Sequence, residues 1–255
     1  MSGPSDGLDR GLVLGRYRVR RGQGAADLAA ARALRAAAFA RPAGHDDDPH
    51  DARCVHVLIE DLSRDEAVAC FRMADLDPAE IETSYAARFY DLSRLARGGG
   101  PLLELGRFCL RPGRRDPDIL RLAWAALSMH VDAAGTRLMF GCASFPGADP
   151  ARHRPALARL ARHHVGPAAL RPGARAPRTV ALDPAPPQPG AATEGLRAMP
   201  PLLRTYLAMG GWVGDHAVID DEMDTLHVLT AVEVAAIPPA RARSIRAVAA
   251  RAVPA

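Results

Sequence analysis

The sequence predicts an α/β protein with a mixed β-sheet that carries helices on both faces. Two observations predict this class. Segments with the period-2 alternation of strands are interspersed with segments whose apolar residues recur at helical spacing. A Ser-Arg-Asp turn at 63–65 joins two of the strand segments, which is typical of a hairpin. With 255 residues, the chain is long enough to bury a sizeable core.

The first half of the chain begins with a short alternating strand. The Ala- and Leu-rich segment that follows has helical spacing, and Pro42 ends it because proline cannot continue a helix. Two strands then flank the hairpin turn, and a further helical pattern precedes a Gly-Gly-Gly-Pro break. In order, we expect a strand at 15–22, a helix at 24–40, strands at 54–62 and 66–76, and a helix at 78–97.

In the second half, the helix expected at 117–134 has the clearest boundaries. Asp116 is a typical N-cap, Pro117 occupies the first helical position, and Gly135 follows the last turn. A second Asp-Pro start predicts a helix at 149–164. We further expect strands at 102–110, 136–145, 179–182, 212–220 and 225–232, and a short helix at 200–211. These elements form one domain at 15–235, between a flexible leader at 1–14 and a basic tail at 236–255.

The composition argues against nucleic-acid binding and against a zinc site. All 33 basic residues are arginine, and the net charge of +4 is too small to indicate nucleic-acid binding. The four cysteines form no Cys-x-x-Cys pair, which favours buried thiols over a zinc site, and we expect no bound metal. There is no signal-peptide pattern and no apolar run of 18 residues. We therefore expect a cytoplasmic protein.

The segment ELGR at 104–107 is the sharpest local anomaly. Residues three apart in a regular strand face opposite ways, yet Glu104 and Arg107 are an acid and a base at this spacing. A β-bulge near Gly106 would change this parity and leave backbone N–H groups available for a carbonyl oxygen. The alternative is a plain strand with an outward-facing acid and an arginine at a rim covered by a helix.

Other charged residues need partners as well. Arg72 lies inside the apolar strand segment CFRM, where a charge requires an acid or a rim position. Glu104 or the acidic loop HDDDPHD at 45–51 can provide the acid. On the preceding helix, Arg35 and Phe39 share one face at a spacing of four residues.

Together these residues resemble a family pattern. The order L-R-x-x-x-F at 34–39, D-x-x-D at 48–51, Arg72, and E-x-x-R at 104–107 is similar to that of the acyl-homoserine-lactone synthases, within the GNAT-like acyltransferases. A closer resemblance is to the bacterial ornithine-acyl-carrier-protein N-acyltransferases, which start ornithine-lipid synthesis. It rests on D-x-D-x-x-D-x(4)-H at 46–56, LLELGRFCLRPGRR, LMFGCASFPG and MPPLLRTYLAMGGWVGDHAVID, and it covers residues 15–232.

The resemblance implies a GNAT-like acyltransferase fold with a mainly antiparallel central sheet. It implies transfer of a (3-hydroxy)acyl chain from acyl-carrier protein to the α-amine of ornithine, with acyl-carrier protein as co-substrate and no bound cofactor. The chain departs from the family at Ala40, Arg41 and His50 and in the strand Ala-Cys-Phe-Arg, so glutamine stays open as the acceptor. An acyl-homoserine-lactone synthase or a non-catalytic carrier- or lipid-binding module are further alternatives.

The site residues follow from the same resemblance. Glu104 is the expected base, direct or through water, and backbone amides around Gly106 to Cys109 are the expected oxyanion donors. The expected catalytic set is Glu104, Asp48, Asp51 and Arg107, and the expected substrate-binding set is Arg35, Phe39, Arg72, Gly106, Phe108 and Cys109. A basic segment is expected to meet carrier protein or phosphopantetheine through Arg111, Arg114, Arg115 and Arg121. The lipid product suggests peripheral contact with the inner membrane, helped by the basic tail.

Overall fold

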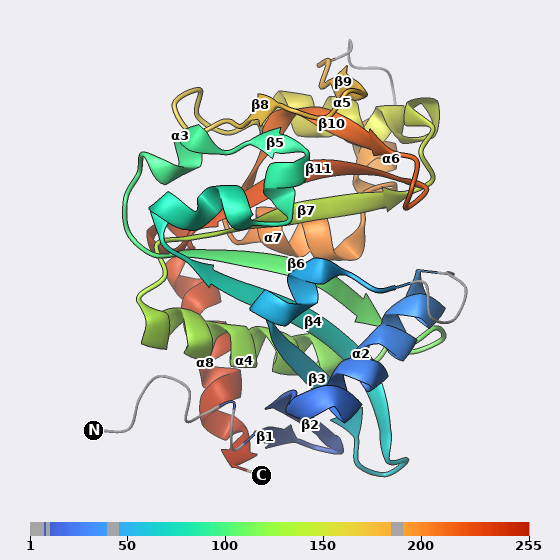
Figure 1. Ribbon diagram of the computed structural model, residues 1–255, viewed down its shortest axis with the longest axis vertical. Coiled ribbons are helices and arrows are strands. Elements are labelled where there is room, and N and C mark those ends of the chain that lie inside the picture. The colour runs from blue at the N-terminus through green and yellow to red at the C-terminus, as the bar shows by residue number, and fades with distance from the viewer. Residues whose placement is uncertain (1–7, 9–10, 40–45, 185–190, 255) are drawn as a thin grey trace. The chain divides into compact units, whose positions relative to one another are not determined.

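The computed structural model describes residues 8, 11–39, 46–184 and 191–254 (Figure 1). The chain divides into two compact units. Unit 1 comprises Met1–Asp75, Leu105–Thr136 and Pro239–Ala255, and unit 2 comprises Leu76–Glu104 and Arg137–Pro238. Strand β6 (Leu102–Leu110) contributes residues to both units.

Unit 1 contains a sheet in the order β12-β1-β2-β3-β4-β6. The pairs from β12 to β4 are all antiparallel, and the predicted hairpin at 63–65 joins β3 to β4. The strands of this unit, apart from β6, are β1 (Leu12–Leu14), β2 (Tyr17–Arg21), β3 (Val55–Asp61), β4 (Glu66–Leu76) and β12 (Val253–Pro254).

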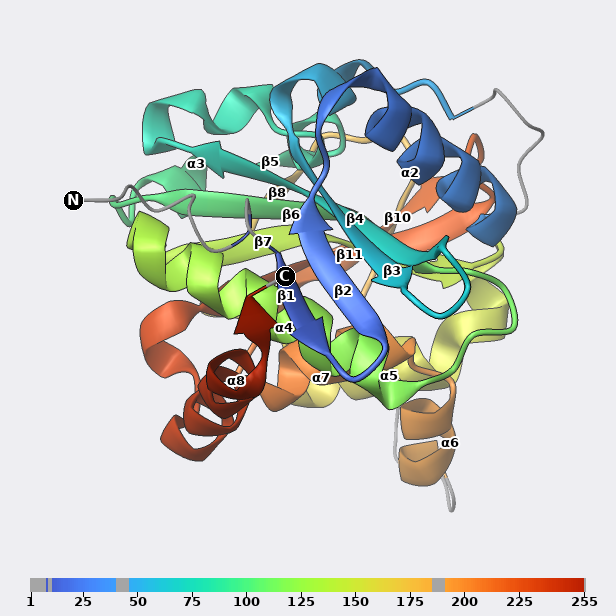
Figure 2. The ribbon, with the colours of Figure 1, turned by 90° about the horizontal axis from the view of Figure 1, so that it is seen from below.

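Helices cover both faces of the unit 1 sheet (Figure 2). On one face, Ala31 and Leu34 of α2 pack against Leu58, Cys70 and Cys109 of three strands. Helix α4 packs against β1 and β2, and α8 packs along α4. The helices of this unit are α2 (Gly24–Ala38), the 3-10 helix η1 (Pro49–Arg53), α4 (Pro117–Ala134) and α8 (Pro239–Arg251).

The predicted boundaries of α4 are confirmed. The Asp116 carboxylate accepts a hydrogen bond of 3.0 Å from the Asp118 N–H, as an N-cap does. Gly135 ends the helix with a left-handed φ of 61°, which a residue without Cβ adopts at no steric cost.

Unit 2 contains a second run of strands in the order β6-β7-β11-β10-β9. Strands β6 and β7 are parallel, whereas the other pairs are antiparallel, so the expected mixed, mainly antiparallel sheet is confirmed. A separate pair joins β5 to β8. The strands are β5 (Tyr90–Asp91), β7 (Leu138–Pro146), β8 (Gly173–Ala174), β9 (Thr179–Ala181), β10 (Trp212–Asp220) and β11 (Thr225–Glu233).

Alternate residues of the unit 2 strands build two cores. On one face of β11, Leu229 and Ala231 join the cluster that contains Leu92 and Leu95. On the other face, Val228 joins the cluster that contains residues of α5 and α7. Both faces are therefore covered here as well. The helices are η2 (Pro78–Thr83), η3 (Ala86–Arg88), α3 (Ser93–Ala96), η4 (Pro150–His153), α5 (Arg154–His163), α6 (Ala191–Arg197), α7 (Pro201–Ala208) and η5 (Val234–Ala236).

The prediction of a single helix at 78–97 is wrong. Two 3-10 helices, a two-residue strand and one turn of α-helix occupy this range instead. Ser84 between the 3-10 helices is extended, with φ −68° and ψ 156°. The N–H groups of Tyr85 and Ala86 donate to the Glu104 carboxylate, so they are not available to continue a helix from η2.

The ends of the chain differ from the expected leader and tail. Strand β1 begins at Leu12, inside the range expected as a flexible leader, and it pairs with both β2 and β12. The basic tail contains α8, in which Arg246 forms a salt bridge of 2.7 Å with Asp132 of α4. Residues 1–7 and 9–10 lie outside the described residues, and the division into leader, domain and tail stays a prediction.

Candidate active site

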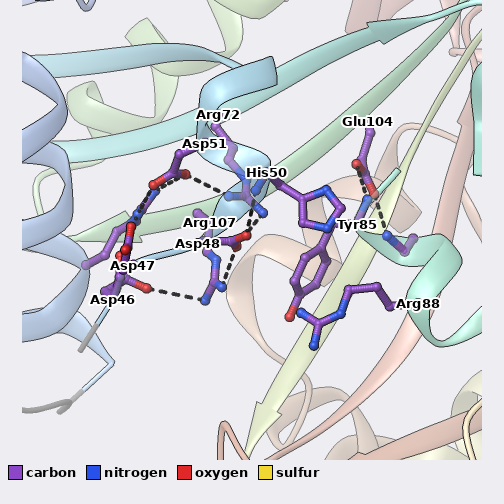
Figure 3. Close-up of polar contacts among 12 residues, drawn as sticks. Asp46, Asp47, Asp48, His50, Asp51, Arg72, Tyr85, Arg88, Glu104 and Arg107 are labelled. Carbon is purple, nitrogen blue, oxygen red and sulfur yellow. Dashed lines mark hydrogen bonds and ion pairs between the residues drawn. The ribbon is translucent and has the colours of Figure 1, made fainter. Parts of the chain in front are cut away.

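Three arginines and three aspartates alternate around a closed ring in unit 1. Figure 3 labels all of them except Arg35. The arginines come from α2, β4 and β6, and the aspartates come from the loop before η1 and from η1 itself. We call this set the acid–arginine ring. Its members are Arg35, Asp46, Arg107, Asp48, Arg72 and Asp51.

One half of the ring centres on Arg72. Its Nη1 lies 2.7 Å from Asp51 Oδ1, and its Nη2 lies 2.8 Å from Asp48 Oδ2. The same Asp48 oxygen lies 2.7 Å from Arg107 Nη2. The acid that Arg72 was expected to need is therefore supplied by the loop.

The other half closes through Arg35, which is only 1% exposed. Its Nη2 lies 2.7 Å from Asp51 Oδ2, and its Nε donates to the Asp46 carboxylate. Asp46 Oδ1 in turn lies 3.6 Å from Arg107 Nη1. The sequence motif D-x-D-x-x-D contained Asp46, but the expected site set did not include it.

The ring is electrically balanced, since three positive charges face three negative charges. Burial alone would raise the pKa of Asp48, but the hydrogen bond from Arg107 and the charge of Arg72 outweigh it and lower the pKa to about 2. In the same way, Arg35 and Arg72 overcome burial and lower the pKa of Asp51 well below its usual range. Both groups are stable carboxylates at neutral pH and weak bases.

The backbone of β6 is irregular where the ring meets it. Arg107 has a left-handed φ of 55°, which a residue with a Cβ rarely adopts inside a strand. A Cβ added at Gly106 would lie 3.4 Å from Arg72 Nε, so glycine leaves room for the Arg72 side chain. The geometry agrees with the expected distortion near Gly106 and not with a plain strand.

Glu104 has a different environment, in unit 2. Its side chain is buried, with 7% exposed. Its Oε2 accepts a hydrogen bond of 2.8 Å from the Tyr85 N–H, and its Oε1 accepts one of 2.7 Å from the Ala86 N–H (Figure 3). We call this the Glu104 niche. Local sequence patterns could not indicate these backbone partners, because they lie 18 and 19 residues away.

Three of the expected substrate-binding residues make packing contacts in unit 1. Phe39 packs half-buried against the cluster under α2. Phe108 stacks on Phe71 with ring centroids 5.3 Å apart. Cys109 is buried, and its Sγ lies 3.5 Å from Cys70 Sγ. The contact of these three residues with substrate stays a prediction.

The basic segment after β6 is largely paired within the chain. Arg114 forms a salt bridge with Glu66, and Arg111 Nε lies 3.5 Å from the same carboxylate. Arg121 pairs with Asp118 at 2.7 Å. Arg115 is exposed. Much of the positive charge expected to attract a partner is thus already balanced by acids.

Two negative findings apply to the described residues only. No group of three or more His, Cys, Asp or Glu side chains among them is arranged to hold a metal ion. No helix in this part of the chain combines the length and the apolar character needed to cross a membrane.

Comparison with known proteins identifies the family. Residues 16–125 match the family model for an acetyltransferase (GNAT) domain. The chain is 33% identical over 244 residues to the L-ornithine N(alpha)-acyltransferase of Rhodobacter capsulatus, covering 87% of this chain and 91% of that protein. The protein belongs to this acyltransferase family. The enzyme of the same name from Rhizobium meliloti is 32% identical over 251 residues, covering 88% of this chain and 83% of that protein.

The expected family and the GNAT-like acyltransferase fold are thereby confirmed. Among solved structures, FeeM, an N-acyl amino acid synthase from uncultured soil microbes, gives a TM-score of 0.48 at 11% identity, covering 92% of this chain and 97% of that chain. A likeness at this level says nothing about function. The roles of individual site residues stay predictions.

Proposed function

We propose that this acyltransferase transfers an acyl chain from a thioester donor to the α-amine of ornithine. The observation that carries the proposal is the 33% identity to an L-ornithine N(alpha)-acyltransferase over 91% of that protein's length. The chemistry has three requirements: a base for the amine, donors for the tetrahedral oxyanion, and a fixed attack geometry. Residues of strand β6 and of the acid–arginine ring are suited to them.

Glu104 is the base in this proposal. An α-amine must lose a proton to attack a thioester carbon, and a carboxylate can accept it directly or through a water molecule. The two backbone hydrogen bonds fix the orientation of the Glu104 side chain. They do not prevent it from accepting a proton, since each oxygen of a carboxylate can accept more than one hydrogen bond.

The oxyanion donors in this proposal are backbone N–H groups between Gly106 and Cys109, on the same strand as the base. The left-handed φ of Arg107 supports this assignment, because a distorted strand can turn N–H groups out of its ladder. Such groups act best where they are oriented before the reaction begins.

The acid–arginine ring holds that distortion in place. It attaches the Arg107 side chain to the loop acids and, through Asp48 and Arg72, to β4. Asp48 and Asp51 are therefore positioning residues, and their lowered pKa values make them poor alternatives to Glu104 as the base.

For the donor we propose acyl-carrier protein. Arg111, Arg114 and Arg121 pair with acids of the chain, and Arg115 and Arg121 are the exposed members of the expected docking segment. Docking of an acidic carrier at this segment should weaken with salt. Helix α8 bears further exposed arginines, including Arg241 and Arg243, and these support peripheral contact with an anionic membrane surface that receives the product.

The test is an assay with purified protein, 3-hydroxyacyl-carrier protein and a panel of free amino acids, with products identified by mass. Wild type should release N-acylornithine. Glu104→Gln should reduce kcat by about 10²- to 10⁴-fold, the usual contribution of a general base. Asp47→Asn, which changes an exposed aspartate beside the ring, is the matched control and should stay active. Acylglutamine as the main product would reassign the acceptor, and no product with any amine would refute the proposal.

A further inference from the structure

Arg88 lies at the end of η3, and its guanidinium packs on two aromatic rings. The Cζ atom lies 5.4 Å from the ring centroid of Tyr85 and 5.3 Å from that of Phe89. Side chains three residues apart in a 3-10 turn eclipse one another, which explains why Tyr85 and Arg88 share a side. Packing against ring faces restricts the guanidinium, so its donors are oriented before a ligand arrives.

The acid nearest to Arg88 holds it only loosely. Arg88 Nη2 and Glu222 Oε2 are 3.9 Å apart, beyond the range of a good hydrogen bond. The two side chains are 47% and 73% exposed. An ion pair of this kind is weak in water, whereas a planar guanidinium binds a well-placed carboxylate through two parallel hydrogen bonds. A ligand carboxylate can therefore replace Glu222.

Arg88 belongs to the same short turn that holds Glu104. The N–H groups of Tyr85 and Ala86 bind the Glu104 carboxylate, and Arg88 follows within three residues. Figure 3 shows Arg88 beside the Tyr85 ring, on the turn that also carries the Glu104 contacts. One 3-10 turn rises only roughly 6 Å, so Arg88 begins close to the backbone groups that bind Glu104. A substrate whose α-amine approaches Glu104 can thus present its carboxylate to Arg88.

We propose that Arg88 binds the α-carboxylate of the amino-acid acceptor and that the Glu222 carboxylate occupies its place until the substrate arrives. This inference rests on the proposed function, because it assigns a specificity residue to that reaction. It explains how the enzyme would select an amino acid over a diamine that carries the same side chain without the carboxylate. Arg88 contributes binding, and Glu104 contributes proton transfer.

The experiment measures KM and kcat for ornithine with wild type, Arg88→Ala and Arg88→Lys. Loss of a carboxylate contact made equally in the ground and transition states should raise KM about tenfold or more with little change in kcat. Arg88→Lys keeps the positive charge but loses the planar guanidinium, so its KM for ornithine should lie between those of wild type and Arg88→Ala. The matched control is Arg178→Ala, which removes an exposed arginine paired with Asp221 of the neighbouring turn and should leave KM unchanged.

A second acceptor sharpens the test. With 1,4-diaminobutane, which is ornithine without its carboxylate, wild type should be much less efficient than with ornithine. Arg88→Ala should lose most of this discrimination, because its site no longer has a guanidinium to bind the carboxylate. Glu222→Gln should keep the discrimination and bind ornithine at least as tightly as wild type does.

Calorimetric titration of ornithine into wild type and Arg88→Ala gives a readout that does not require turnover. Binding that weakens only in the Arg88 variant supports the inference even if the donor in the assay is the wrong one. Equal ornithine affinity in the two proteins overturns it. So does a raised KM for the acyl donor with an unchanged KM for ornithine, since Arg88 would then serve the donor. A wild type that binds ornithine but acylates no amine refutes the proposed function alone.

Discussion

The acid–arginine ring and the Glu104 niche hold buried carboxylates in opposite ways. In the ring, every aspartate contacts at least two arginines, and the pKa values of Asp48 and Asp51 are lowered. In the niche, Glu104 is oriented by two backbone N–H groups, which carry partial charges. Full ion pairing produces a rigid group that resists protonation. Backbone N–H donors carry only partial charges, so each one stabilises a carboxylate less than a full opposing charge does.

The largest expected effect comes from breaking the ring at Arg35. Arg35→Met would leave Asp46 and Asp51 short of a buried partner, and uncompensated buried charge typically costs about 3–5 kcal/mol. Urea unfolding of the variant measures the loss. Arg32→Met is the matched control, because Arg32 lies on the rim of the ring, is 35% exposed and contacts Asp51 at 3.2 Å. Its removal should cost about 1 kcal/mol or less. Equal losses at the two positions would mean that the ring is not a stabilising unit.

The next effect distinguishes His227 of unit 2 from Asp48 of unit 1 by the pH at which each loses its contribution to stability. Burial, and secondarily the charge of His216, lowers the pKa of His227 in unit 2 to about 4. The unfolded chain takes up this proton near pH 6.5. The stability that neutral His227 contributes is therefore fully present above pH 6.5. It is lost as the pH falls to 4, and the loss amounts to up to about 3 kcal/mol. Asp48 in unit 1 is protonated near 3.8 when unfolded and near 2 when folded, so its contribution is lost only below pH 3.8.

Unfolding free energies measured between pH 7 and 4 test this difference. His227→Gln should flatten the slope in that window, whatever its effect on stability at pH 7. His163→Gln, a change at the exposed end of α5, should alter the slope much less than His227→Gln does. An unchanged slope in His227→Gln would show that this imidazole is not kept neutral by the fold.

Much of this architecture could be predicted from local sequence. The helix α4 follows from its Asp-Pro start and its terminal glycine, and the charge of Arg72 inside an apolar strand correctly indicated a buried acidic partner. The structure of residues 78–97 could not be predicted in this way. The Glu104 carboxylate accepts hydrogen bonds from N–H groups that the local sequence pattern assigns to a helix. The pairing within the basic segment could not be predicted for a similar reason: Glu66, which pairs with Arg114, lies 48 residues earlier.

The smallest expected effect tests the distorted strand itself. At an ordinary strand position such as Arg18 of β2, glycine is less stable than alanine by about 0.5–1 kcal/mol, because glycine loses more backbone entropy on folding. At position 107 the order should reverse. Both Arg107→Ala and Arg107→Gly remove the same ion pairs, but only alanine keeps a Cβ at a φ of 55°, at a cost of about 1 kcal/mol or more. Urea unfolding of the four variants compares the two positions directly. If glycine is the less stable residue at both, the strand stores no strain at Arg107, and the proposed backbone donors between Gly106 and Cys109 lose the distortion on which they depend.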